Sequence, residues 1–189
     1  MSNTLSRWHA EHLNFGKLLD LLEAQLRFFH DGKSPDYELM LDVMYYMTHY
    51  PDVLHHPKED LVFARIKERD PSVTSAVDKL LEQHVSLKAC GEELVRELDG
   101  VVDGTIMSRE RIETTARAYL DEFRRHMRIE EDQILPLASK LLQRKDWSEI
   151  DAAIRHFEDP LFGARTEERY TALARQIKGQ GRSASAAMG

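Results

Sequence analysis

The stretch from Ile112 to Leu137 constrains the fold most, because its apolar residues recur every three or four positions. This spacing is typical of a helix with one buried face. His126 and Glu130 fall on that face four residues apart, so their side chains project from nearly the same side of the helix. An imidazole and a carboxylate are costly to bury unless something binds them. A metal ion would bind both, and the stretch therefore predicts a metal site inside a helical core.

The rest of the chain shows the same spacing in three further long segments. We expect helices over residues 5–29, 36–68, 72–99 and 108–143, separated by turns that contain glycine or proline. Ser108 is the expected N-cap of the fourth helix. Pro51 and Pro57 interrupt the second, so a kink or a short break is expected there. The predicted fold class is all-α, an up-down-up-down four-helix bundle with additional short C-terminal helices.

The chain divides into three parts on this interpretation. Residues 1–145 form the four-helix bundle, which is long enough to bury a core of its own. Residues 146–178 form a C-terminal helical extension packed on the bundle, with one helix from Trp147 and another over 165–178. Residues 179–189 are rich in glycine, serine and alanine, and we expect a disordered tail there.

Composition narrows the class of protein. The net charge is −7 and no basic block is present, which argues against nucleic acid and anionic membranes as partners. No apolar run approaches the roughly 20 residues needed to span a bilayer, and the first residues lack the apolar core of a signal peptide. A single cysteine, Cys90, excludes an internal disulfide framework. These features predict a cytoplasmic protein. Whether it is a monomer or a homodimer stays open at this stage.

Each of the four long helices has one histidine on its apolar stripe. Counted from the expected helix ends, the four lie at one level to within roughly 2 to 5 Å, at about 1.5 Å per residue. Glu59 follows the second histidine by four residues, as Glu130 follows the fourth. The candidate metal ligands are therefore His12, His55, Glu59, His84, His126 and Glu130.

Two carboxylates can bridge two metal ions, with two histidines completing each ion's protein ligands. This mixture of imidazole and carboxylate suits iron, with manganese or zinc as second choices. Six side chains cannot fill two octahedra, so positions stay open for dioxygen, peroxide, nitric oxide or water.

Three further residues are candidates for supporting the site. His56 and Asp60 have the same spacing as His55 and Glu59. The apolar stripe of the helix favours His55 and Glu59 as the ligands. Because Pro57 can rotate this segment, His56 remains a candidate substitute ligand or a group that supports the ligands from behind. His9, one turn before His12, and Tyr119, two turns before His126, are candidates for the same supporting role. A surface histidine and a packed core tyrosine are the competing interpretations.

Four short motifs follow one another in the chain: Glu11-His12, HHPKED at 55–60, Glu82-Gln83-His84, and HMRIEED at 126–132. In their order and spacing the chain resembles the hemerythrin-like, or HHE cation-binding, family over residues 8–137. The resemblance implies a four-helix bundle that holds a non-haem di-iron centre with oxo, hydroxo and carboxylate bridges, and it implies the six ligands named above. Lys88 stands where oxygen-carrying hemerythrins have a further histidine. The remaining set is more similar to bacterial proteins that repair iron centres and to the iron-sensing domain of a eukaryotic ubiquitin-ligase subunit.

The expected function is that of a non-haem di-iron protein that binds or senses a small ligand, either dioxygen, peroxide or nitric oxide, or that senses iron itself. The alternative is a di-iron enzyme that acts on peroxide or nitric oxide, or in the repair of iron centres. A third interpretation is a helical interaction domain with a structural ion such as zinc. Nothing in the sequence marks a substrate pocket or a redox-partner site, so the question of enzyme or binder stays open at this stage.

Overall fold

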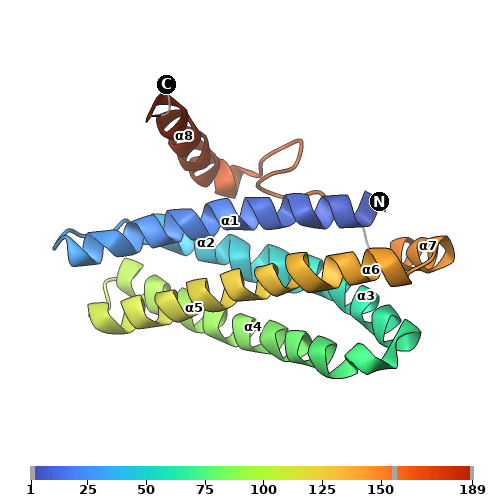
Figure 1. Cartoon of the computed structure of the whole chain (residues 1–189). Coiled ribbons are helices and arrows are strands. Elements are labelled where there is room, and N and C mark those ends of the chain that lie inside the picture. The colour runs from blue at the N-terminus through green and yellow to red at the C-terminus, as the bar shows by residue number, and fades with distance from the viewer. Residues whose placement is uncertain (1–2, 155–156, 188–189) are drawn as a thin grey trace.

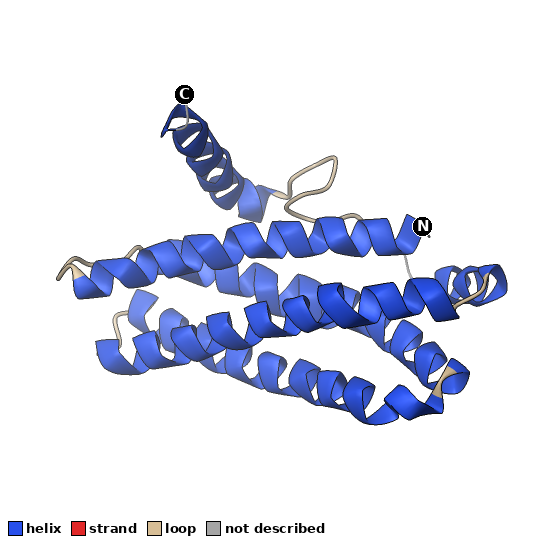
Figure 2. Ribbon diagram, in the orientation of Figure 1, coloured by secondary structure: helices blue, strands red, loops and turns tan. Residues whose placement is uncertain are grey.

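A computed structural model describes residues 3–154 and 157–187 of the chain. Every regular element in these residues is a helix (Figure 2). The α-helices are α1 (Asn3–His30), α2 (Tyr37–Tyr50), α3 (His56–Arg69), α4 (Thr74–Val102), α5 (Arg109–Ile129), α6 (Leu135–Leu141), α7 (Arg144–Ala153) and α8 (Thr171–Ala187). Two π-helices, η1 (Pro51–His55) and η3 (Glu130–Ile134), and two short 3₁₀-helices, η2 (Pro71–Val73) and η4 (Glu168–Tyr170), complete them.

Four long rods lie side by side and form the body of the molecule (Figure 1). They are α1, α2 with α3, α4, and α5 with α6, and consecutive rods run in opposite directions. Gly32 and Gly104 end two of the rods with positive φ angles of 68° and 85°. In each case the next N–H donates to a carbonyl five residues back, which closes the last turn of the helix. The all-α bundle predicted from the sequence is confirmed.

The expected interruption of the second rod takes the form of the π-helix η1. The N–H of His56 donates to the carbonyl oxygen of Pro51, five residues back rather than four. Pro57 has no N–H, so the regular helical ladder cannot continue through it. The wider turn leaves both His55 and His56 buried, although on a regular helix consecutive residues point about 100° apart.

A second π-helix, η3, lies where we predicted an uninterrupted helix. The N–H of Leu135 donates to the carbonyl oxygen of Glu130, and Pro136 follows directly. The extra residue in this turn shifts the buried stripe by one position. Leu135 is buried, whereas Leu137, which the sequence pattern had placed on the stripe, is only half-buried. A single proline is therefore the physical reason for this difference.

The core is divided by the histidine level into two apolar clusters. The larger cluster lies toward the C-terminal end of α1 and the N-terminal end of α5. It includes Met40, Met44 and Met47. The smaller cluster lies on the other side, around Trp8 and Phe63. The candidate site is thus enclosed by apolar packing along the bundle axis.

The C-terminal segment contacts the bundle through three buried residues, Leu161, Tyr170 and Leu173. The hydroxyl of Tyr46 in α2 donates to Asp159 at 2.8 Å, which fixes the turn that leads to α8. The helix expected from Arg165 begins later, with η4, and α8 continues to Ala187. This helix therefore extends beyond residue 178, the boundary expected from the sequence. Residues 188 and 189 lie outside the described residues.

The short helix α7 is held against α3 by a buried carboxylate. Asp146 accepts hydrogen bonds from Arg65 at 2.8 Å and from Arg69 at 2.7 Å. It also accepts the backbone N–H of Gln143 and thereby caps its own helix. Because the two arginines surround it, the pKa of Asp146 is lowered to about 2. Among the described residues, no helix combines the length and the apolar composition that crossing a bilayer requires.

Candidate metal centre

The six predicted ligands meet in one buried cluster at the middle of the bundle. Each of the four rods supplies one histidine, and both glutamates lie between them. All six side chains are buried, and four of them are only 1% exposed. They come from α1, the end of η1, the first turn of α3, the middle of α4, the end of α5 and the start of η3, and they are His12, His55, Glu59, His84, His126 and Glu130.

The histidines form two pairs that present their Nε2 atoms to each other. His12 Nε2 lies 3.1 Å from His55 Nε2, and His84 Nε2 lies 3.2 Å from His126 Nε2. Two nitrogens bound at right angles to one ion, at about 2.1 Å each, would lie about 3.0 Å apart. Each pair therefore has the separation of two neighbouring ligands of a single ion.

Glu59 reaches both pairs with its two oxygens. Its Oε1 lies 2.9 Å from Nε2 of His55 and 3.5 Å from Nε2 of His12. Its Oε2 lies 3.5 Å from Nε2 of His84. This carboxylate spans the gap between the two histidine pairs.

Glu130 spans the same gap between the two histidine pairs. Its Oε2 lies 3.4 Å from Nε2 of His12. Its Oε1 lies 3.2 Å from Nε2 of His126 and 3.9 Å from Nε2 of His84. The arrangement has two positions, each next to two imidazoles and one oxygen of each carboxylate.

The carboxylates of Glu59 and Glu130 provide the test of whether a metal fits. All four of their oxygens are buried, and none accepts a hydrogen bond of good geometry from the described part of the chain. A buried carboxylate without such partners is strongly unfavourable, and metal coordination is one of the few ways to compensate it. The donor set and the spacing of the Nε2 atoms fit two divalent or trivalent cations.

The other ring nitrogen of each histidine, Nδ1, lies within hydrogen-bond distance of a side chain on a neighbouring rod. Glu11 of α1 lies 2.5 Å from His55, and Asp60 of α3 lies 3.0 Å from His84. The remaining two contacts are Gln83 of α4 to His126 at 3.0 Å and Glu131 of η3 to His12 at 2.7 Å. The four contacts form a closed ring around the bundle, from each rod to the next.

These four outer contacts determine which nitrogen of each imidazole is free to bind a metal. A hydrogen bond from Nδ1–H to an oxygen leaves the lone pair on Nε2, which points to the centre of the cluster. Metal-binding histidines are oriented in this way, and the outer partner also makes the imidazole a stronger ligand. The four histidines are thus arranged for coordination through Nε2.

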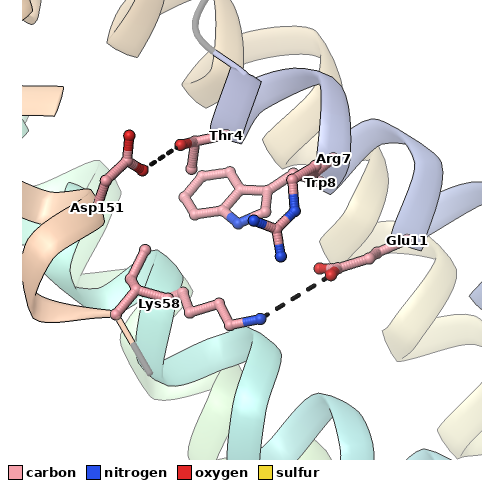
Figure 3. Close-up of a pocket in the computed structure, with 7 residues that line it drawn as sticks. Thr4, Arg7, Trp8, Glu11, Lys58 and Asp151 are labelled. Carbon is pink, nitrogen blue, oxygen red and sulfur yellow. Dashed lines mark hydrogen bonds and ion pairs between the residues drawn. The ribbon is translucent and has the colours of Figure 1, made fainter. Parts of the chain in front are cut away.

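Glu11 is itself positioned by two further side chains. The hydroxyl of Tyr50 donates to it at 3.1 Å. Lys58, from the first turn of α3, approaches Glu11 to 3.9 Å, and Trp8 lies beside them (Figure 3). At the edge of the same pocket Thr4 donates to Asp151 of α7 at 2.5 Å, which ties the start of α1 to the end of the bundle (Figure 3).

Without a cation, the charges of the cluster are balanced by protons. Burial lowers the pKa of His12, but the carboxylates of Glu131 and Glu59 raise it more, to about 10. Burial also opposes protonation of His84, yet Asp60 and the central carboxylates raise its pKa to about 11. Burial raises the pKa of Glu59, and the surrounding histidines nevertheless hold it well below its usual value. A cation that enters must therefore displace protons from the imidazoles.

The three supporting candidates differ in where the structure places them. His56 is buried beside the cluster, with Nδ1 3.2 Å from Asp52 rather than pointing toward Asp60. His9 lies at the surface, where its Nδ1 is 3.0 Å from Glu131. Tyr119 is buried against Phe123, whose ring separates it from the cluster.

The outer ring was not predicted from the sequence, although a signal for it was present. Each of its members stands directly beside a candidate ligand in the chain, as Glu11 stands beside His12. The sequence does not show that each one serves the histidine of a different rod, because that depends on how the rods are rotated against each other. The members are Glu11, Asp60, Gln83 and Glu131.

Comparisons with known proteins agree with this geometry. A search of curated proteins and a search of solved structures gave no match. A scan of protein families matches the hemerythrin HHE cation binding domain over residues 3–138, which includes the four rods as far as the middle of α6 and all six clustered side chains. The chain therefore belongs to the hemerythrin HHE cation-binding domain family.

Proposed function

We propose that the protein binds two iron ions and uses them to bind or sense a small ligand such as dioxygen, peroxide or nitric oxide. The observation that supports this most directly is the placement of Glu59 and Glu130, each of which spans both histidine pairs. A single ion would need only one of these positions. Two bridging carboxylates and paired imidazoles suit a dinuclear centre.

The chemistry of the ligand set favours iron or manganese over copper(I) and over the zinc sites that use thiolate, and of the two we propose iron. Imidazole and carboxylate without sulfur suit iron and manganese, whereas sites for copper(I) and many structural zinc sites use thiolate. Cys90 lies on α4 toward α5, where its Sγ is 3.8 Å from the carbonyl oxygen of Thr115. It is not part of the cluster.

An iron pair supplies redox chemistry and open positions for a small ligand when bound. The chain's own residues would hold it and limit access to it. Phe15 lies against His55 and Phe63 against His84, with ring centroids 4.9 Å and 5.7 Å apart. Because these rings cover part of the cluster, we propose a ligand of two or three atoms.

We propose that a small ligand approaches the cluster from the side of His12. A surface groove is lined by His9 and Glu131 together with Leu5, Leu135 and Pro136. Glu131 contacts His9 with one oxygen and His12 with the other, so a single side chain stands between this groove and the first histidine pair. A small polar ligand would approach along this groove.

The experiment is a titration of the iron-loaded protein with nitric oxide or peroxide under anaerobic conditions. A binding or sensing protein should show one saturable spectral change per centre and then stop consuming the ligand. Continued consumption in the presence of a reductant would contradict this proposal and support a di-iron enzyme instead. The absence of any spectral change with either ligand would leave iron itself as the signal and would contradict small-ligand binding.

A further inference from the structure

A segment that lies outside the matched family domain is attached to the rod that carries His55. The family match ends at residue 138, whereas Asp159 lies in the turn that leads to η4 and α8. One oxygen of the Asp159 carboxylate accepts the backbone N–H groups of Leu161 and Phe162, both at 2.8 Å. The other oxygen accepts the hydroxyl of Tyr46 in α2, also at 2.8 Å. A single carboxylate thus closes the turn and fixes it to the bundle.

Tyr46 is completely buried and belongs to a group of aromatic rings in contact. Its ring lies on that of Tyr50, one turn later, with 5.4 Å between centroids and 13° between planes. Phe162 and Tyr170 of the C-terminal segment pack against Tyr46 at nearly right angles, with centroid distances of 5.8 Å and 5.7 Å. The C-terminal segment therefore contacts Tyr46 through two rings as well as through Asp159.

Tyr50 continues this contact toward the metal cluster. Its hydroxyl donates to one oxygen of Glu11 at 3.1 Å, and the other oxygen of Glu11 lies 2.5 Å from Nδ1 of His55. A continuous line of contacts therefore runs through His55, Glu11, Tyr50, Tyr46 and Asp159. The step between the two tyrosines is a ring stack, and every other step is a polar contact to a carboxylate.

His55 is the member of this line that a bound metal would restrain. When Nε2 of His55 binds a metal, the plane of its ring is fixed, and Nδ1–H holds the Glu11 carboxylate in one orientation. A fixed Glu11 in turn fixes the hydroxyl of Tyr50 and the ring on which Tyr46 stacks. Because the turn is attached through the Tyr46 hydroxyl, a restraint on Tyr46 favours the attached form of the turn.

We propose that residues 158–173 are a regulatory element whose docking on α2 is coupled to metal binding beside His12 and His55. The element with two states is the Asp159 turn, which is either docked or released. Figure 1 shows α8 standing away from the rods beyond this turn, so release of the turn frees the base of the whole helix. This inference rests on the proposed function, since it supplies the output of the sensing site.

Hydrogen exchange tests this coupling without any measurement of activity. It is measured by mass spectrometry, on the peptide that covers Leu161 and Phe162, in metal-free protein and in protein loaded anaerobically with iron(II). We expect exchange at least about 5-fold slower in the iron-loaded form, the lower end of the usual range for coupled sites. Tyr50→Phe keeps the stacked ring and removes only the hydroxyl that contacts Glu11. The exchange rate in this variant should no longer depend on iron.

Linkage requires the same effect in the opposite direction. Tyr46→Phe removes the hydrogen bond to the turn, so it should weaken iron binding by about the factor by which iron slows the exchange. Tyr37→Phe is the matched control, because Tyr37 lies at the start of α2 and its ring contacts Phe29 instead. It should change neither quantity. The N–H of Thr105, which closes another turn by donating to Gly100, is the internal reference and should exchange equally with and without iron.

The outcomes separate the two proposals. Equal exchange of the Asp159 turn in both forms, or an iron effect that persists in Tyr50→Phe, would overturn the coupling and leave the dinuclear site intact. Fewer than two irons per chain in the natural protein would contradict the proposed function itself, and the coupling with it.

Discussion

Glu59 and Glu130 each span the same two pairs of histidines, although the two glutamates lie on different rods of the bundle. Each of them has one oxygen near His12 and the other near His84. Each also follows a histidine of the cluster by four residues. The two halves of the bundle thus use the same helical spacing to provide equivalent carboxylates.

This equivalence predicts that Glu59→Gln and Glu130→Gln lose metal to a similar degree. Glutamine keeps the size of the side chain but removes the charge and one of the two bridging oxygens. We expect each variant to bind iron more than about 100-fold more weakly, a larger effect than that of an outer partner. Metal content after dialysis against a graded series of chelators measures it.

Glu122, which is half-buried and accepts a hydrogen bond from Ser86, offers a control on the same helix as His126. Glu122→Gln should bind iron as the natural protein does. If one central variant lost its metal and the other kept both ions, the two carboxylates would not be equivalent bridges.

The outer ring predicts a smaller effect for residues that never touch the metal. Glu11→Gln and Glu131→Gln weaken the support of His55 and His12 by replacing a charged acceptor with a neutral one. Removal of such a partner usually reduces metal affinity about 10- to 100-fold. Competition with a coloured chelator checks this value, and Glu23→Gln, at a surface contact with Arg124, is the control. Unchanged affinity in both ring variants would mean that the ring does not orient the histidines.

Much of this centre could be predicted from the sequence, because a helix converts spacing into direction. The four-residue steps from His55 to Glu59 and from His126 to Glu130 survive in the structure even though a π-helix lies beside each pair. Helical spacing alone could not decide whether His55 or His56 is the metal ligand of the second rod. The choice depends on the local width of η1, which the hydrogen bond from His56 to Pro51 reveals and the sequence pattern does not.

The raised pKa values of the histidines predict how the stability of the metal-free protein depends on pH. The pKa is about 10 for His12 and about 11 for His84 in the folded state, against an ordinary value of 6.5. A group with a raised folded pKa contributes stability that is fully present below about pH 6.5 and is lost as the pH rises through the folded value. The metal-free protein should therefore unfold at lower denaturant concentration at about pH 9 than at about pH 6.5.

The iron-loaded protein should show the opposite trend, because protons compete with the metal for the same imidazoles and acid releases it. Parallel denaturant titrations of both forms make the comparison. Equal pH trends in the two forms would be evidence against shared proton and metal sites.

Close packing between α2 and α4 predicts a test of the fold that leaves the metal ligands untouched. A Cβ on Gly91 would lie 2.9 Å from the methyl group of Thr48 and 3.1 Å from the ring of Tyr119. Overpacking of this kind costs about 1–3 kcal/mol, which exceeds the gain of up to about 1 kcal/mol in helix propensity. Gly91→Ala should therefore lower the free energy of unfolding.

Gly16→Ala is the matched control, since nothing lies within 4 Å of the added Cβ. It should raise the free energy of unfolding by about 0.5–1 kcal/mol. Denaturant unfolding measures the free energy of unfolding of both variants. Stabilisation of both would show that α2 and α4 are less closely packed than described.

The central claim is that this bundle holds a pair of irons between two carboxylates and their histidines. Its most direct test is metal analysis of the aerobically purified protein together with its absorption spectrum. We predict two irons per chain and near-ultraviolet absorption from a bridged diferric pair, both absent from His126→Ala. One redox-inert ion per chain, or unchanged iron content in His126→Ala, would contradict the claim.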